Sequence, residues 1–496
     1  MKSPEPLPPP IETQDGRSLR ELVRSAVIWR SGTQIVGQLI TWASTFLVIR
    51  ILDPRDYGLY AMTAVILNLL SLVNGYSLAN AAIQKRELTP LMLRQLLGML
   101  VVLNLGLAAI QFAAAPFVAA YYGQPVVAEM LRVQCLLYVT NPFLALSYAV
   151  LSRRMDFKIQ AQANLVSAIL GSVAALGGAF AGLGVWALVI APLVTFASRA
   201  LIVTLASRSF VMPSFAFSGA WDMAAYGGTV LVGSFAWFIA TQTDILMGGR
   251  VLDPAGLGFY TTALFLTQMF VTKFVPPVNE VAFSAYARIQ DDPRAVAHAF
   301  LKATRIIFLA GMPFCLGMAA VAEPMVKVLL DTKWMDAAPI VGLLGLAMPF
   351  MAMQVLFGPT LNAIGKPGVT AVTSGIAAIL LTACYAFGLQ WGATGLAASW
   401  LVGYPLLVAM SAAIVLPKIG VHWSDYLRAL LPPAAAGAMM YAGVRALTPM
   451  VEVPSPLLKL AILVAAGGAI YAAAMLLFGR ERVGELLDLA RSRKPA

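Results

Sequence analysis

The sequence predicts an all-α membrane protein with about 14 transmembrane helices, built from two parallel six-helix repeats followed by two C-terminal helices. Three observations predict this class: an apolar composition, apolar stretches of helical length, and a duplicated motif. Hydrophobic residues make up 60% of the 496 residues, and charged residues only 11%. Soluble domains of that total length could not cover their surfaces with so few charges, so lipid must be the solvent.

Apolar stretches recur along the chain at the length that a membrane requires. A helix crosses the hydrocarbon core with about 20 mainly apolar residues. Fourteen such stretches occur, over residues 26–49, 57–83, 96–119, 135–151, 160–180, 184–206, 223–247, 256–283, 303–321, 338–361, 368–389, 392–416, 426–447 and 456–478. Runs such as AAILLTACYAF do not alternate between apolar and polar residues as barrel strands do, so we expect helices.

Basic residues are distributed unevenly over this topology. The net charge is +11, from 34 Lys and Arg against 23 Asp and Glu. With a cytoplasmic N-terminus, 25 basic residues fall on the cytoplasmic side and eight on the opposite side. This is the positive-inside bias, so the charge is explained by orientation rather than by a nucleic-acid partner. Both termini are therefore expected in the cytoplasm.

The remaining composition narrows the class further. Three cysteines lie in separate apolar stretches and only two histidines occur, which excludes a disulfide framework or a Cys/His metal cluster, and no cofactor is expected. Residues 1–20 are Pro-rich and polar and predict a disordered cytoplasmic tail rather than a signal peptide. We expect an N-lobe over 21–215, a C-lobe over 216–417, two further helices over 418–480, and a cytoplasmic tail over 481–496.

An internal repeat organises the chain. RILDPRDYGLY at 50–60 and RVLDPAGLGFY at 250–260 share six of eleven residues at an offset of 200. The motif positions are Arg50, Asp53, Pro54, Gly58 and Tyr60, matched by Arg250, Asp253, Pro254, Gly258 and Tyr260. Turn chemistry alone favours Asp, Pro and Gly but does not require matching Arg and Tyr. Since six helices separate the copies, both enter from the same side and the repeats are parallel.

These hairpins resemble those of bacterial polysaccharide and O-antigen flippases, within the multidrug, oligosaccharidyl-lipid and polysaccharide exporter superfamily. The resemblance is carried by the first hairpin, by Asp244 to Tyr260, and by the turn at Asn362, Gly365, Lys366 and Pro367; it departs at Asp253, where Gly is expected. It implies two six-helix lobes around a central cavity that opens alternately to each side of the bacterial inner membrane. The implied cargo is an undecaprenyl-pyrophosphate-linked oligosaccharide, with membrane lipid, a polysaccharide polymerase and other export proteins as partners.

Two helices carry polar faces that suit a cavity. Arg30, Gln34 and Gln38 share one face of the first helix, where Arg30 either anchors a diphosphate with paired donors or extends to the membrane interface. Trp237, Thr241 and Asp244 share a face of the seventh. Asp244 is either a proton or cation site or the partner of a basic residue in a buried ion pair.

The eighth predicted helix combines charges with two prolines. Pro276 and Pro277 remove backbone donors, which is tolerated in a membrane inside protein or along a wet cavity. Lys273 either contacts the cargo's phosphate or pairs with Asp244, and Glu280 lies seven residues further on the same face. None of these charges recurs at an offset of 200, so the charges break the symmetry of the repeat.

Three functions are compatible with the sequence. The first is a flippase for a lipid-linked oligosaccharide, and the second is a multidrug or cation exchanger of the same superfamily. The third is a membrane-embedded polysaccharide polymerase or ligase, which needs a long outward loop, whereas the longest expected outward connection is 322–337. Polar residues of the second and fourth helices either bind sugars or join helices; they are Asn68, Ser71, Asn74, Gln134, Tyr138 and Asn141. A Gly-rich phosphate loop for ATP is absent from the sequence, so we expect the energy to come from an ion gradient or from the cargo's own gradient.

Overall fold

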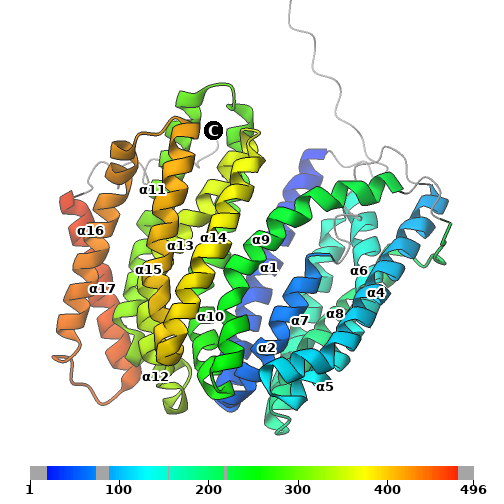
Figure 1. Ribbon diagram of the computed structural model, residues 1–496, viewed down its shortest axis with the longest axis horizontal. Coiled ribbons are helices and arrows are strands. Elements are labelled where there is room, and N and C mark those ends of the chain that lie inside the picture. The colour runs from blue at the N-terminus through cyan, green and yellow to red at the C-terminus, as the bar shows by residue number, and fades with distance from the viewer. Residues whose placement is uncertain (1–18, 74–88, 155, 217–220, 479–496) are drawn as a thin grey trace, which may run out of the picture. The chain divides into compact units, whose positions relative to one another are not determined.

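The computed structural model describes residues 19–73, 89–154, 156–216 and 221–478, with side chains described outside 19–31 and 221–234. Over these residues the only regular elements are α-helices and short 3-10 turns (Figure 1). In this part of the chain, nine helical segments are long and apolar enough to cross a membrane. The predicted all-α membrane class is therefore confirmed.

The chain divides into two compact units, which are described separately. Unit 1 comprises Met1–Leu52 and Ile66–Val230, and unit 2 comprises Asp53–Val65 and Leu231–Ala496. In unit 1, α7 packs against both α1 and α8, while α4 and α8 pack against α6. Its helices are α1 (Leu19–Ile51), the later part of α2 (Pro54–Ser71), α4 (Pro90–Tyr122), α5 (Pro125–Gln134), α6 (Leu136–Arg153), α7 (Phe157–Phe180) and α8 (Val185–Ser207).

Unit 2 is a larger bundle in which α13 is central, since α10, α11, α14 and α15 all pack against it. The last two helices pack against each other and on α11. Its helices are α9 (Trp221–Val251, from Leu231), α10 (Pro254–Arg288), α11 (Pro293–Ala320), α12 (Ala322–Leu329), α13 (Ala337–Ala363), α14 (Pro367–Gly388), α15 (Gly392–Val415), α16 (Trp423–Leu447) and α17 (Pro456–Phe478). Short turns η1 (Thr332–Trp334), η2 (Leu389–Trp391) and η3 (Leu416–Ile419) join some of them.

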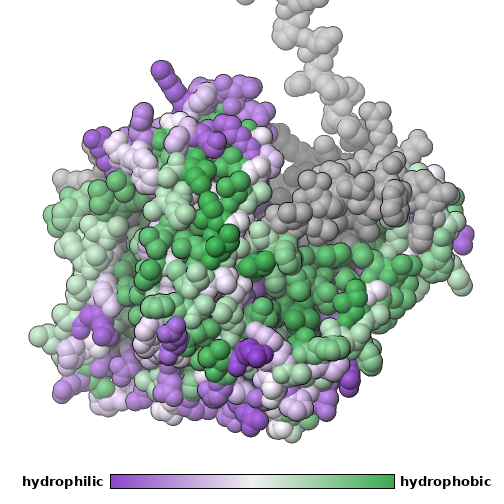
Figure 2. Space-filling view, in the orientation of Figure 1, coloured by the Kyte–Doolittle hydropathy of each residue, from purple (hydrophilic) through white to green (hydrophobic). Residues whose placement is uncertain are grey.

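Hydrophobic residues cover the outside of the helices of unit 2 in a belt, with hydrophilic residues gathered towards the helix ends (Figure 2). Large apolar side chains are exposed on helices of unit 2, including Ile379 at 77% and Leu477 at 75%. In water such a surface would promote aggregation, but in a bilayer it meets lipid tails as apolar as itself. The belt therefore supports the prediction that lipid is the solvent.

The Asp-Pro pair of the repeated motif starts a helix in both copies. Asp253 is the N-cap of α10, where its carboxylate accepts hydrogen bonds from the backbone N–H groups of Ala255 and Gly256 at 3.2 and 3.3 Å. Pro254 follows at the first helical position, where its missing N–H costs nothing. The backbone of Asp253 has φ −66°, so the position does not require the glycine that the family resemblance suggested.

The glycines of the motif have a different role from the Asp-Pro pair. They allow the backbones of the two motif copies to touch. A Cβ added to Gly58 would overlap the carbonyl oxygen of Pro254, and one added to Gly258 would overlap that of Pro54. All four residues lie in unit 2, where the start of α2 crosses the start of α10. The contact is reciprocal, as expected for two copies of one motif related by a local two-fold axis.

An aromatic residue of the η1 turn fills the space beside this crossing. Trp334 is fully buried, and its ring packs edge-on against Tyr57 at 5.5 Å and Phe259 at 5.9 Å between centroids. Lys333 forms an exposed ion pair with Asp53 at 3.4 Å. Residues 53–60 of the first motif copy are thereby packed into unit 2 although they belong by sequence to the first repeat, whereas residues 50–52 lie in unit 1.

Candidate functional site

A row of polar side chains runs along the exposed face of α10. Lys273, Glu280, Ser284 and Arg288 are spaced seven, four and four residues apart, which places them on one face of the helix, and all four are exposed. We call this row the α10 stripe. It is exposed because the opposite face of α10 packs on α13, to which Asn279 donates a hydrogen bond at the Val355 carbonyl oxygen, 3.3 Å away.

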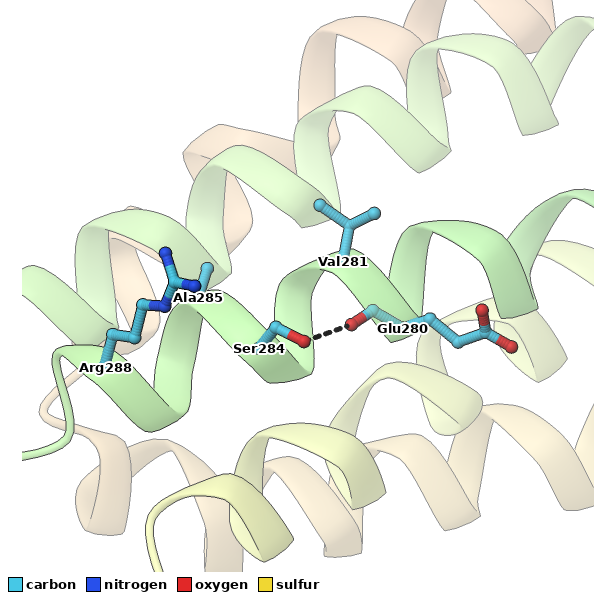
Figure 3. A pocket seen from close by; sticks show the side chains of 5 residues that line it. All are labelled: Glu280, Val281, Ser284, Ala285 and Arg288. Atoms are coloured by element: carbon cyan, nitrogen blue, oxygen red, sulfur yellow. Dashed lines mark hydrogen bonds between the residues drawn. The ribbon is translucent and has the colours of Figure 1, made fainter. Parts of the chain in front are cut away.

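A pocket of about 420 Å³ lies over the C-terminal part of the α10 stripe (Figure 3). Glu280, Ser284 and Arg288 line it together with Val281 and Ala285. The Ser284 hydroxyl donates to the Glu280 carbonyl oxygen at 3.2 Å, while the Glu280 carboxylate extends away from Arg288. The pocket thus offers a guanidinium at one end and a carboxylate at the other.

Within the described part of the chain, Lys273, Glu280 and Arg288 form no side-chain hydrogen bond or ion pair. Lys273 therefore does not pair with Asp244, which was one of the two roles that the sequence left open. Charges that lack an ion-pair partner within a membrane generally face a cavity or bind a ligand.

The paired prolines add uncharged acceptors beside Lys273. Helix α10 continues through Pro276 and Pro277 to Arg288, but neither proline has an N–H to donate four residues back. The carbonyl oxygens of Thr272 and Lys273 therefore cannot receive the usual helical hydrogen bond. Both residues are exposed, so these carbonyls require water or a ligand as partner.

Asp244 lies in a separate, fully buried site of unit 2. Its Oδ2 accepts a hydrogen bond from the Tyr260 hydroxyl at 2.6 Å, and the Tyr260 oxygen accepts another from the Trp400 indole N–H at 2.9 Å. Asp244 is 0% exposed, as are Tyr260 and Tyr404, and Trp400 is 1% exposed. The chain of bonds joins α9, α10 and α15, so the motif tyrosine has a specific partner.

The other oxygen of this carboxylate has no partner. In the described part of the chain, Oδ1 of Asp244 is buried without a hydrogen bond, as are the hydroxyls of Tyr385 and Tyr404. Trp400 stacks on Tyr404 at 4.6 Å between centroids and lies 6.0 Å from Tyr385. No described basic residue pairs with Asp244, and the Arg30 side chain, which the sequence offers as a partner, lies outside the described residues.

The other predicted cavity residues are spread over several surroundings. The Arg30 side chain lies outside the described residues, while on α1 of unit 1 Gln34 is exposed and Gln38 half-buried. Trp237 and Thr241 are half-buried on α9, and the Thr241 hydroxyl donates to the Trp237 carbonyl at 3.0 Å. The Thr241 hydroxyl therefore forms its hydrogen bond within its own helix.

Polar residues of the predicted fourth helix join helices to each other. The Tyr138 hydroxyl donates to the Gln111 side-chain oxygen at 2.7 Å, and Asn141 donates to Asn104 at 3.4 Å. These bonds connect α6 to α4 in unit 1, and Gln134 of α5 is buried at 0% exposure. On α2, Ser71 donates to the Asn68 carbonyl at 2.7 Å, and Asn74 lies outside the described residues. The bonds on α6 favour the interhelical role over sugar binding.

Sequence reasoning missed two lining residues of the pocket, Ser284 and Arg288. In the sequence, Arg288 was considered only as one of the cytoplasmic basic residues. It lies fifteen residues after Lys273, close to a whole number of helical turns, so the helical period could have placed both residues on one face. Trp400, by contrast, is 140 residues from its partner Tyr260, and no local pattern indicates that contact.

The chain is similar to known proteins over most of its length. A family model described as "Polysaccharide biosynthesis protein" matches residues 47–339. The succinoglycan biosynthesis transport protein ExoT of Rhizobium meliloti (strain 1021) is 27% identical and the match covers 94% of this chain and 95% of that protein. The lipopolysaccharide biosynthesis protein WzxC of Escherichia coli (strain K12) is 22% identical, with 84% and 85% covered.

Solved structures share the fold. The lipid II flippase MurJ in an inward closed conformation superposes with a TM-score of 0.74 at 13% identity, covering 92% of this chain and all of MurJ. An inward-facing multidrug resistance transporter of the MATE family gives a TM-score of 0.61 at 14% identity, covering 80% of this chain and 98% of that one. At these identities the likeness is one of fold.

Proposed function

The chain belongs to the polysaccharide biosynthesis protein family, and from that premise we propose that it flips a lipid-linked oligosaccharide across the bacterial inner membrane. The cargo is an undecaprenyl-pyrophosphate-linked glycan, carried by alternating access. The names of the relatives support a role in polysaccharide transport, since ExoT is a biosynthesis transport protein and WzxC serves lipopolysaccharide biosynthesis. Both termini lie in the cytoplasm, and a polysaccharide polymerase receives the product.

The α10 stripe is the observation that carries the proposal. Lys273 and Arg288 are exposed on α10 and have no ion pair among the described residues, so both are available to an anionic group. A phosphate group satisfies such cations with charge-assisted hydrogen bonds, and Arg288 can offer it two parallel donors. From the sequence alone, Arg30, Gln34 and Gln38 on α1 of unit 1 are proposed separately as donors of the same chemistry.

The spacing of the stripe favours two successive positions for the headgroup. Lys273 and Arg288 are fifteen residues apart, about 22 Å along the helix axis, which exceeds the reach of one diphosphate. The headgroup is first held by Arg288 and then by Lys273. Glu280 lies between them and repels the anion, so the cargo does not rest midway.

Asp244 is proposed as the site where a proton or cation drives the cycle. Its carboxylate is buried with one unpartnered oxygen, and aromatic rings surround it. Protonation of the carboxylate neutralises its charge, and a bound cation compensates it. Either event reduces the cost of burying the negative charge. The test is transport in liposomes with a pH gradient or a sodium gradient imposed alone; Asp244→Asn should abolish the stimulation by whichever gradient acts. If neither gradient changes the wild-type rate, this role is wrong.

The phosphate proposal is tested in a host strain that lacks the chromosomal gene, by measuring exported polysaccharide. Lys273→Glu should abolish export, and Lys273→Arg should retain most of it. Loss of one charged hydrogen bond costs about 1.5–3 kcal/mol, or roughly 10–150-fold in cargo affinity. Lys327→Ala is the matched control, because Lys327 is an exposed lysine on the short helix α12. Normal export by Lys273→Glu at equal membrane abundance would contradict the proposal.

Two alternative functions make different predictions. A multidrug or cation exchanger should change the susceptibility of the host to cationic drugs, whereas a flippase should not. A membrane-embedded polymerase or ligase should transfer sugar in the purified state. The printed name of ExoT, a transport protein, and the fold shared with two solved transporters support the flippase over the enzyme.

A further inference from the structure

An apolar groove of about 440 Å³ lies on unit 2 between α14 and α15, apart from both sites described above. Leu343 of α13 contributes to its floor. Phe387, Trp391 and Val402 line it while remaining 63%, 59% and 58% exposed, so large apolar side chains form its rim. The rings of Phe387 and Trp391 pack edge-on at 4.9 Å between centroids.

Small residues create this groove. A Cβ on Gly388 would lie 2.5 Å from the Gly395 carbonyl oxygen, and a Cβ on Gly395 would overlap that of Gly388 in return. The two helices therefore meet closely where η2 joins them. Ala398 and Ser399 continue the lining along α15 with little side-chain volume, which leaves space beside them.

The groove offers nothing to a polar ligand. None of the described residues that line it is charged. Its two hydroxyls donate within their own chain segment, from Thr394 to the Trp391 carbonyl at 3.3 Å and from Ser399 to the Leu396 carbonyl at 2.6 Å. The segment Pro367–Ile419, which provides nearly all of the lining, is long and apolar enough to cross a membrane. The groove therefore opens towards hydrocarbon.

We propose that this groove binds one acyl chain of a bilayer phospholipid. At about 30 Å³ per water-sized group, its volume of about 440 Å³ holds about 15 such groups, which suits a single acyl chain and is too small for a whole polyprenyl chain. Trp391 lies in the connection between two spans, where an indole ring sits at the level of the lipid headgroups. The chain enters beside Trp391 and extends along Ala398 towards Val402.

Native mass spectrometry of the full-length protein tests the proposal, after reconstitution in dipalmitoyl phosphatidylglycerol vesicles and mild extraction. The wild type should retain one phospholipid that Ala398→Phe, which fills the groove, binds about tenfold more weakly or worse. Ile379→Phe is the matched control, since Ile379 is a 77% exposed residue of α14 outside the groove. Equal phospholipid retention by Ala398→Phe and the control would overturn the proposal.

A second measurement covers the case in which Ala398→Phe does not fold. Cys384 lines the groove and is half-buried, so its reaction with an apolar maleimide reports occupancy in a chain whose other cysteines, Cys135 and Cys315, are replaced by alanine. Added dipalmitoyl phosphatidylglycerol should slow the reaction several-fold. An unchanged rate would overturn the proposal, as would slowing by a polyprenyl phosphate but not by the phospholipid. Neither result depends on the identity of the transported cargo.

Discussion

The glycine crossing of the two motif copies gives a sharp quantitative prediction. In Gly58→Ala the new methyl group would overlap the Pro254 carbonyl oxygen, which belongs to the backbone and cannot rotate away. Overpacking of this kind costs about 1–3 kcal/mol. Alanine is also better than glycine inside a helix by about 0.5–1 kcal/mol, which offsets part of that cost. We therefore expect a net loss of stability of up to about 2.5 kcal/mol.

The matched control separates packing from helix propensity. Gly375 is also helical, lies in unit 2, and has no atom within 4 Å of an added Cβ. Gly375→Ala should gain the stability that alanine gives a helix, without any steric overlap. The free energies of unfolding of Gly58→Ala and Gly375→Ala should therefore differ by about 1–3 kcal/mol, the cost of overpacking. Thermal unfolding of the purified protein, followed by tryptophan fluorescence, measures this difference at about 2 °C per kcal/mol.

The reciprocal contact between the two glycines allows a second test, which distinguishes this crossing from a general loss of stability. Gly258→Ala should cost about as much as Gly58→Ala, because its methyl group overlaps the Pro54 carbonyl in the same crossing. Once one methyl group has forced the helices apart, the second finds space, so the double variant should cost clearly less than the sum. Additive costs, or single variants as stable as Gly375→Ala, would refute the crossing.

Three further changes test the packing of unit 2 by the same unfolding assay. Asp253→Ala should destabilise by about 1 kcal/mol, because the N-cap of α10 loses its two hydrogen bonds. Tyr260→Phe should cost about 1–3 kcal/mol by leaving the buried carboxylate of Asp244 without its donor, and Asp244→Asn in the same chain should recover part of that loss. Trp334→Ala should cost about 3–5 kcal/mol, whereas Lys333→Ala should cost less than about 1 kcal/mol, because its ion pair is exposed.

Each of these has a control and a contrary outcome. Asp291→Ala removes an exposed carboxylate that caps no helix and should be neutral; an equal loss would show that the capping bonds of Asp253 contribute nothing. If Asp244→Asn deepens the defect of Tyr260→Phe, the carboxylate has a partner other than the tyrosine. Trp391→Ala removes an indole that is 59% exposed, so a loss as large as that of Trp334→Ala would mean that burial does not decide the cost.

Local patterns were enough to predict most of the helices, but α5 and α12 lie in predicted connections, and α11 begins at Pro293 rather than near residue 303. Apolar stretches of about 20 residues predict helices in any membrane protein, because an unsatisfied backbone cannot lie in hydrocarbon. The Asp-Pro pairs predict helix N-termini through capping and a fixed φ, and Asp253 caps α10 as that chemistry requires. The helical period likewise placed Lys273 and Glu280 on one face, and both are exposed there.

Contacts between distant segments could not be predicted in this way. Helical spacing put Asp244 on one face with Trp237 and Thr241, but it could not show that Tyr260 and Trp400 would enclose the carboxylate. The same spacing allowed Tyr138 to face either sugars or another helix, and the bond to Gln111 depends on where α4 packs. The residues that surround a side chain depend on which helix packs against its own.

The sequence by itself determined the solvent, the helices and the duplication, because these follow from the period of apolar residues and from the repetition of RILDPRDYGLY as RVLDPAGLGFY. Only the tertiary structure decided what the repeated glycines are for. Their lack of a side chain matters solely because Gly58 meets Pro254 and Gly258 meets Pro54, across 200 residues of chain. Close packing depends on how two surfaces fit together. The sequence pattern of each segment predicts its own surface, but not which other surface it packs against.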